Sequence, residues 1–335
     1  MRSPKRNIPP RFSQYQPKLK KEFFSVKYWT TWSSFGALWL LAYIPQAWRV
    51  RLATVAGSLI YRYHKKRRDI VDLNLSWCFP DLSEEERNDL GKQCFRYLVQ
   101  SILDTGVLWW RSTERVRKHI QFQGVEHLER ELAEGRCVMV LSGHSPALEK
   151  GGVAMSMDYP MTSFTNESNN PLIEWMAARK RTRFGGYVFP RGGGFRNVIK
   201  AMRDGYGLYI LTDEDLGADS AHFIPLFGIP KATLTTPLRL AKLTDAVILT
   251  SYTWYDDERS CYIMEFSPAM PNLTTFEEEE SLALLNERLE AAIRKQPAQY
   301  MWSLRIFKTM YDGSPPPYYR RSKPGSGPRT RPEGL

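Results

Sequence analysis

The chain has 335 residues, enough for one α/β catalytic domain with attached segments, and a net charge of +11. The positive charge lies at the two ends: residues 1–27 sum to +7 and residues 314–335 to +4, so the part between them is neutral. The four cysteines form neither a CxxC pair nor a compact framework, so we expect reduced, mostly buried thiols and a body in the cytoplasm. Basic ends can bind nucleic acid or anionic membrane, but no nucleic-acid recognition motif accompanies them, so we expect no nucleic-acid partner.

An uncharged segment, residues 28–48, follows the basic N-terminal arm, 1–27. Its 21 residues are close to the roughly 20 apolar residues that span a bilayer, and its Trp and Tyr side chains suit the membrane interface. Pro45 and several Ser and Thr residues weaken the case for a spanning helix. We expect a membrane-anchor helix here, spanning or interfacial, with a buried core helix as the alternative. A cleaved signal peptide is not expected, because the apolar run starts late.

Residues 49–313 are predicted to be the catalytic domain, and 314–335, rich in Pro, Gly, Ser and Arg, a disordered basic tail. Apolar residues at helical spacing predict a helix over 49–66, and Ser83 with Glu86 forms a capping box that starts a helix running toward Trp110. From residue 120 onward, β-rich runs alternate with helical stretches, which predicts an α/β layered domain. The β-rich runs are 137–141, 187–189, 208–211, 247–252 and 262–266, and a late amphipathic helix is predicted over 277–295.

The most informative local pattern begins with an apolar strand predicted over residues 138–141. A glycine then permits a tight exit, and the Ser-Pro pair at 145–146 predicts the N-cap and first position of a helix. His144 is therefore expected at the carboxyl end of a strand, with Glu149 in the first turns of the next helix. Open α/β sheets usually place their sites there.

A carboxylate bound to one ring nitrogen of a histidine fixes its tautomer and leaves the other nitrogen free to take a proton from a hydroxyl. We therefore predict His144 as a general base and Glu149 as the partner that orients it, without a protein nucleophile. Alone, this spacing is more typical of a surface histidine beside a glutamate at a helix start. The local pattern needs support from the rest of the chain.

Further blocks supply that support. The chain has His-x4-Glu at 144–149, a Gly-Gly-Tyr-Val-Phe-Pro-Arg run at 185–191, Asp-x-Asp at 213–215 before a proline-bearing block at 223–236, and a terminal block at 299–308. In this order they resemble the late acyltransferases of lipid A biosynthesis, the lauroyl and myristoyl transferases, within the glycerolipid acyltransferase superfamily. The resemblance covers roughly residues 28–319. It departs from the family pattern in the Ser-Pro-Ala-Leu run after His144 and in Leu304.

The resemblance implies a glycerolipid acyltransferase-like fold, a mixed sheet flanked by helices. It also implies that a hydroxyl of a glycolipid acceptor, a lipid A precursor, attacks a fatty acyl thioester on an acyl carrier protein. His144 would be the base and Glu149 its partner, with no covalent acyl-enzyme. The expected location is the bacterial inner membrane, with the catalytic domain on the cytoplasmic face. Neither a cofactor nor a metal is expected.

Catalysis of this kind needs positive charge for the developing oxyanion and for the phosphates of the acceptor. The candidates are the arginines around the glycine pair at 185–186, of which Arg191 fills the arginine position of the second block. They are Arg179, Arg181, Arg183 and Arg191, and for the first three a solvated helix face is the alternative. Asp213 and Asp215 could hold Mg²⁺, but we expect them to hold neighbouring arginines in place. Asn170, at a predicted helix start, stays a substrate-binding candidate through the resemblance.

Two other functions fit the same chain. The first is acylation of another membrane lipid, such as a lysophospholipid, from coenzyme A or acyl carrier protein. The second is a non-catalytic membrane adaptor with basic arms. The identity of the acceptor separates the first from lipid A acylation, and a His144→Ala variant tests the second.

Overall fold

The computed structural model describes residues 15–319 and residue 331. The predicted basic arm and basic tail therefore fall partly outside the described residues, at 1–14, 320–330 and 332–335. Within the described part, two short 3₁₀ helices, η1 (Lys21–Phe24) and η2 (Val26–Tyr28), bury Phe23 and Tyr28 against the domain. Tyr318, beyond the predicted domain end at 313, donates a hydrogen bond to Asn74 (2.6 Å). Residues before position 49 and after position 313 therefore pack against the rest of the structure.

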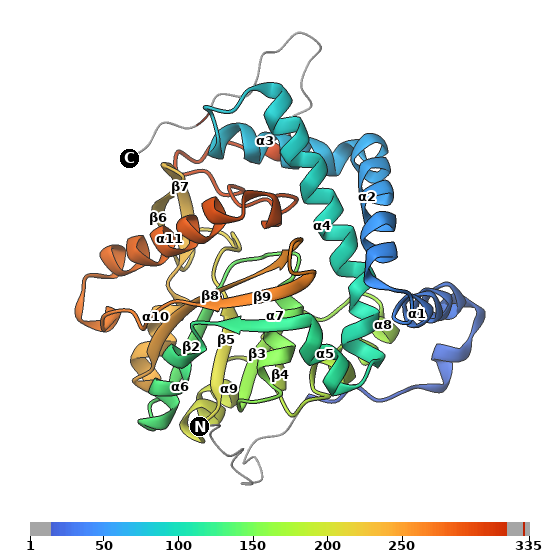
Figure 1. Cartoon of the computed structure of the whole chain (residues 1–335). Helices are drawn as coiled ribbons and strands as arrows, with labels where there is room; N and C mark the ends of the chain where they lie inside the picture. The colour runs from blue at the N-terminus through green and yellow to red at the C-terminus, as the bar shows by residue number, and fades with distance from the viewer. Residues whose placement is uncertain (1–14, 320–330, 332–335) are drawn as a thin grey trace.

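A seven-stranded sheet forms the centre of the molecule, in the order β1-β9-β8-β2-β5-β3-β4 (Figure 1). All neighbouring strands are parallel except β8 and β9, which form an antiparallel pair, so the predicted α/β fold with a mixed sheet is confirmed. A separate antiparallel hairpin is made by β6 and β7. The strands are β1 (Ile120–Gln123), β2 (Val138–Ser142), β3 (Met161–Thr165), β4 (Tyr187–Pro190), β5 (Gly207–Leu211), β6 (Ala221–Leu226), β7 (Ile229–Leu234), β8 (Val247–Asp256) and β9 (Cys261–Phe266).

Helices cover both faces of the sheet, because alternate side chains of a strand point to opposite faces. Met139 and Leu141 of β2 pack with residues of α9, α10 and α11, whereas Val138 and Val140 pack with residues of α6 and α7. The helices are α1 (Trp29–Leu41), α2 (Gln46–Tyr63), α3 (Lys65–Cys78), α4 (Glu84–Trp110), α5 (Thr113–His119), α6 (Val125–Ala133), α7 (Leu148–Met155), α8 (Pro171–Arg181), α9 (Arg196–Arg203), α10 (Thr236–Thr244) and α11 (Glu278–Lys295). The predicted α4 capping box and the predicted α11 are confirmed.

The predicted anchor segment, 28–48, is not one helix. α1 ends at Leu41, a turn follows, and α2 starts at Gln46 directly after Pro45, whose ring cannot continue a helix from the preceding residues. Within residues 15–319 and 331, no helix combines the length and apolar character needed to cross a membrane. The anchor itself stays a prediction.

Helix α2 lies alongside α4 (Figure 1). Small residues lie at this contact, whereas most of the large apolar side chains of α2 are exposed. Ala53 and Gly57 are buried, and a Cβ at Gly57 would come within 2.7 Å of the α4 backbone. The helices therefore approach closely on that side. The apolar positions that predict the helix are exposed instead. The exposed large apolar side chains of α1, of the turn after it and of α2 are Trp29, Trp39, Leu40, Tyr43, Ile44, Trp48, Leu52, Val55, Leu59, Ile60 and Tyr63.

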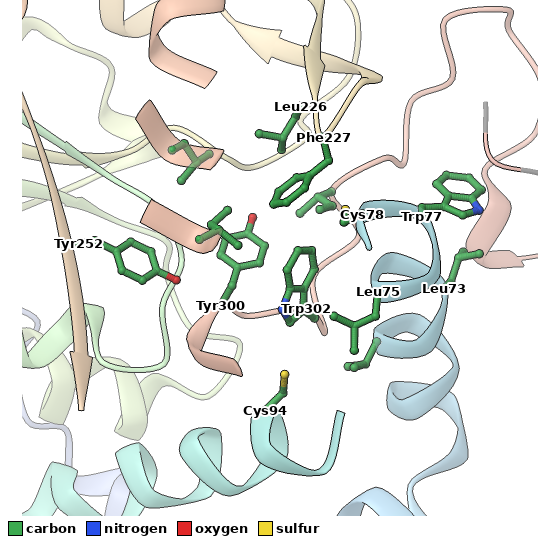
Figure 2. Close-up of a cluster of buried hydrophobic side chains, with 14 of the residues drawn as sticks. Leu73, Leu75, Trp77, Cys78, Cys94, Leu226, Phe227, Tyr252, Tyr300 and Trp302 are labelled. Carbon is green, nitrogen blue, oxygen red and sulfur yellow. The ribbon is translucent and has the colours of Figure 1, made fainter. Parts of the chain in front are cut away.

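A second feature that positions the site is a buried aromatic cluster around the terminal block (Figure 2). The rings of Tyr300 and Trp302 lie 4.8 Å apart, centroid to centroid, and Trp302 contacts Phe227 of the β6–β7 turn. The side chain of Asn74 on α3 donates to the carbonyls of Trp302 (2.7 Å) and Leu304 (2.8 Å). The terminal block is thereby fixed between α3 and the sheet.

Candidate functional site

The site begins where β2 ends. A Cβ at Gly143 would come within 2.5 Å of a Leu289 methyl group, so a larger residue here would require the Leu289 side chain on α11 to move. His144 follows, and its carbonyl accepts a hydrogen bond from Met301 N (2.8 Å). The predicted helix start at Ser145 is wrong: the chain makes a turn first, and α7 starts at Leu148. The histidine therefore leaves the strand on a tight turn held by the terminal block.

The partner of the His144 ring is Asp213, which follows β5. His144 Nδ1 lies 2.7 Å from Asp213 Oδ1, and the other carboxylate oxygen accepts from His144 N (2.7 Å) and from the Tyr300 hydroxyl (2.8 Å). The Asp213 side chain is fully buried, while 12% of the His144 side chain is exposed. A carboxylate at Nδ1 requires the hydrogen there, so Nε2 is the proton acceptor. Nε2 has Glu214 Oε1 at 3.9 Å.

The charges around this pair reinforce one another. Burial alone lowers the pKa of His144, but the charge and hydrogen bond of Asp213, with Glu214, raise it above the ordinary value for histidine. Burial raises the pKa of Asp213, but the charge and hydrogen bonds of His144 outweigh it and lower that pKa to about 2. Lys231 is fully buried nearby, and although burial lowers its pKa, it interacts electrostatically with Asp213, Glu214 and Asp215. Asp213 therefore stays ionised and stabilises an imidazolium.

Glu149 does not contact the ring, so the predicted His144–Glu149 pairing is corrected. The helix starts later than predicted, and Glu149 instead lies 3.4 Å from Arg181 Nη2. Its other oxygen, Oε1, is buried and forms no hydrogen bond with any residue in the part of the chain that the structure describes. Burial alone would raise the pKa of Glu149, but the charges of Arg181 and Lys150 outweigh burial and hold that pKa below the ordinary value for glutamate. Glu149 thus fixes an arginine in the site.

A cavity of about 420 Å³ opens beside His144, between α4, α7 and the ends of β3, β4 and β5. Leu98 and Ile102 of α4, Val153 of α7 and Phe164 of β3 give it apolar walls. His144, Glu149, Arg181, Arg191 and Glu214 also line it. The lining is therefore partly apolar, and it also presents one histidine, two guanidinium groups, the amine of Lys150, two carboxylates and several Ser and Thr side chains.

The four candidate arginines have different positions. Arg181 and Arg191 line the cavity, Arg181 also donating to Thr165 Oγ1 (2.8 Å) and Arg191 pairing with Glu214. Arg183 donates to the carbonyls of residues 108 and 111 and so caps the carboxyl end of α4. Arg179 is exposed on α8, outside the cavity lining. The solvated or structural alternative therefore describes Arg179 and Arg183 better than a substrate-binding role.

Asn170 and Asp215 also act within the protein. Asn170 Oδ1 caps α8 by accepting from Leu172 N (3.0 Å), which confirms the predicted helix start, and its Nδ2 donates to Thr31 on α1. Asp215 accepts from Thr309 N and Thr309 Oγ1, both at 2.6 Å. The expectation that Asp213 and Asp215 hold arginines is corrected, because Glu214 between them binds Arg191.

Sequence reasoning missed three residues of the site: Glu214, Tyr300 and Lys150. Glu214 and Tyr300 stand inside quoted blocks, but the blocks alone did not give their contacts. Lys150 is a charged residue in an apolar stretch of α7, and its buried amine donates to Ser101 Oγ (2.7 Å) and Thr105 Oγ1 (3.1 Å). Burial lowers the pKa of Lys150 to about 8. Its place in an apolar stretch was the signal that the sequence offered for it.

Comparison with known proteins gives a consistent family. Residues 16–309 match the family described as bacterial lipid A biosynthesis acyltransferase. A lipid A biosynthesis acyltransferase of Haemophilus influenzae is 33% identical over 89% of this chain and 94% of its own length. The lipid A biosynthesis palmitoleoyltransferase of Escherichia coli is 32% identical over 88% of this chain and 96% of its own, and the lauroyltransferase of that organism is 30% identical over 90% and 99%.

A solved structure, the 1-acyl-sn-glycerophosphate acyltransferase of Thermotoga maritima, also matches. It is 14% identical with a TM-score of 0.36, over 76% of this chain and 99% of that one. A similarity this low supports no further conclusion.

Proposed function

We propose that this chain, which belongs to the bacterial lipid A biosynthesis acyltransferase family and is therefore an acyltransferase, acts on a lipid A precursor. In the proposed reaction a fatty acyl chain moves from an acyl carrier protein thioester to a hydroxyl of that precursor. The observation that carries this proposal is the His144–Asp213 pair at the wall of an apolar cavity. A hydroxyl needs a base to attack a thioester, and an apolar cavity suits a fatty acyl chain.

His144 is the proposed base. Its Nε2 takes the proton of the acceptor hydroxyl while that oxygen bonds to the thioester carbonyl carbon. The tetrahedral intermediate then expels the thiolate, and the imidazolium returns the proton to that sulfur. Asp213 holds the ring orientation and stabilises the imidazolium, so the reaction needs no covalent acyl-enzyme. This role replaces the one that the sequence suggested for Glu149.

The negative charge that develops on the carbonyl oxygen needs a fixed positive group nearby. Arg191 is the proposed group, because its charge already acts on His144 and it lines the same cavity. Glu214 binds Arg191 and limits the positions its guanidinium group can take. Arg181, held by Glu149, is the second cavity cation and the proposed contact for the acceptor.

Association with the inner membrane, on its cytoplasmic face, is proposed from the exposed large apolar side chains of α1, of the turn after it and of α2. There are eleven of these side chains, several with an aromatic ring that prefers the interface. Charge adds to this: the N-terminal arm has a net +7, and each basic group near an anionic surface contributes about 1 kcal/mol. Of the two forms of the predicted anchor, we propose the interfacial one, in which α1 and α2 lie in the membrane interface and do not span the bilayer.

The test is mass spectrometry of lipid A and phospholipids from cells with and without the gene. Loss of the gene is expected to reduce the mass of lipid A by one fatty acyl group, and the wild-type gene on a plasmid to restore it. A change confined to phospholipids would contradict the proposed acceptor and favour acylation of a lysophospholipid.

A further inference from the structure

The terminal block at 299–308 does more than support the catalytic pair. Its first half contacts that pair through Tyr300 and Met301. Its second half, residues 303–306 and 308, lines a second cavity of about 620 Å³, whose opposite wall includes residues 64, 66 and 67 at the junction of α2 and α3. Glu214 lines both this cavity and the apolar one. Asp213, which also lines the second cavity, bonds to the His144 ring, so the second cavity lies next to the catalytic pair.

Four cationic side chains line the second cavity: Lys66, Arg67, Arg305 and Lys308. Within residues 15–319 and 331, no hydrogen bond or ion pair engages the amines of Lys66 and Lys308. Arg67 uses one N–H to bind the Ser303 carbonyl (3.2 Å), which ties the two walls together. His64 accepts at Nδ1 from Arg67 N (3.4 Å), so its neutral ring carries a hydrogen on Nε2. The walls therefore offer several hydrogen-bond donors, including four cationic side chains.

The cavity also has three carboxylates, but each is engaged within the protein. Asp213 accepts from His144 and Tyr300, and Glu214 pairs with Arg191. Asp215 accepts from Thr309 and from the backbone N–H of residue 217. The buried Lys231 lies close enough to these three carboxylates for their charges to raise the pKa of its amine, against the lowering effect of burial. The carboxylates are therefore satisfied, while the amines of Lys66 and Lys308 form no ion pair with any carboxylate among the described residues.

We infer that this second cavity is a phosphate subsite for a substrate of the acyl transfer. Lysine binds phosphate as a point charge and arginine can bind it through two parallel hydrogen bonds. A phosphate held here would lie in the cavity that Asp213 and Glu214 also line, next to the catalytic pair. Two substrates of the proposed function offer this group, the phosphopantetheine arm of the acyl donor and a phosphorylated sugar of the acceptor, so the source rests on that function.

Binding is measured first, independently of acyl transfer. Isothermal titration calorimetry with inorganic pyrophosphate compares the wild type with Lys66→Ala/Lys308→Ala. We expect binding by the wild type and an affinity about 10-fold or more lower in the variant, because charge-assisted hydrogen bonds are lost. Lys92→Ala/Lys242→Ala is the matched control, since it removes two charges at exposed positions outside the cavity, and should bind as the wild type does. Absent binding by the wild type, or equal binding by all three proteins, overturns the subsite.

Kinetics then identify the source of the phosphate. KM is measured for lauroyl-phosphopantetheine and lauroyl-pantetheine, and for the glycolipid acceptor with and without its phosphates. In the wild type, one of these pairs should differ by about 10-fold or more in KM, and the difference should nearly vanish in Lys66→Ala/Lys308→Ala. If the variant loses the KM difference between the two donors, the site binds the donor. If it loses the KM difference between the two acceptors, the site binds the acceptor. Transfer by the wild type with no such loss in either pair overturns the subsite, whereas failure of all transfer contradicts the proposed function instead.

A charge-conserving variant separates loss of charge from damage to the fold. Lys66→Arg/Lys308→Arg keeps both positive groups and should keep pyrophosphate affinity within a few-fold of the wild type. A loss as large as that of the alanine variant, with an unchanged melting temperature, would contradict a role for the charges.

Discussion

Replacing Asp213 by Asn is the perturbation that most sharply separates the observed geometry from the spacing-based hypothesis. Three donors converge on Asp213: the ring Nδ1 and backbone N–H of His144, and the hydroxyl of Tyr300. An amide has one acceptor oxygen, and the two donors that share Oδ2 will take it. The amide NH₂ group then faces Nδ1, which must accept, and the hydrogen moves to Nε2. The histidine is left in the tautomer that cannot act as a base.

The size of the effect follows from the charges. His144 and the other donors hold the pKa of Asp213 at about 2 instead of 3.8, despite burial, which corresponds to roughly 2 to 3 kcal/mol. Loss of a positioned general base reduces turnover by about 10²-fold to 10⁴-fold. We expect kcat of Asp213→Asn to fall by that factor, with a smaller change in KM. Acyl transfer from lauroyl carrier protein to purified lipid A precursor, followed by mass spectrometry, measures both constants.

The pH dependence adds a second readout. Asp213 raises the pKa of His144, and a base must be unprotonated, so wild-type kcat/KM should fall as pH drops through a value above the ordinary 6.5. Without the charge of Asp213 the pKa of His144 should be lower, so the acid limb of any residual activity should shift to lower pH. Glu149→Gln is the comparison variant, and its acid limb should match the wild type. The reasoning is refuted if Asp213→Asn keeps wild-type kcat and pH profile, or if Glu149→Gln shifts the acid limb instead.

Three further predictions address the reaction, the packing and the membrane face. Intact-mass spectrometry of the wild type incubated with acyl donor alone should show no acyl adduct, and a stoichiometric adduct would contradict direct transfer. Gly106→Ala should lower the free energy of unfolding by about 1 to 3 kcal/mol, because its Cβ would come within 2.1 Å of a carbonyl of α1, whereas Gly36→Ala, with open space, should be neutral or stabilising in thermal denaturation. Leu40→Glu/Trp48→Glu should reduce co-sedimentation with phosphatidylethanolamine–phosphatidylglycerol vesicles, while the exposed control Leu243→Glu should not; equal binding would argue against an α1–α2 membrane face.

Local signals predicted the central elements well. The capping box at Ser83 and Glu86 fixed the start of α4, and the apolar spacing of 277–295 gave α11 with its buried face. Short apolar runs predicted β2, β4, β5, β8 and β9, because strands buried on both faces are nearly continuous in apolar residues. The order of the strands depends on contacts between distant segments, and no local pattern encodes it.

The site was predicted in part for the same reason. His144 was placed correctly after β2, since a strand, a glycine and a turn are local features. Its partner was not, because the ring is oriented by Asp213, 69 residues away and brought beside β2 by the β2–β5 pairing. The exposure of the apolar side of α2 could not be predicted for a similar reason. Periodicity shows that an apolar face exists, but close packing through Ala53 and Gly57 decides which side of the helix is buried.

The central claim is that His144 is the base of an acyl transfer to a lipid A precursor. It is tested most directly by comparing purified wild type and His144→Ala, each checked by thermal denaturation, in the transfer assay with acyl carrier protein donor. The account predicts product from the wild type and none above the background without enzyme from the variant. Equal product from a folded His144→Ala protein would contradict it.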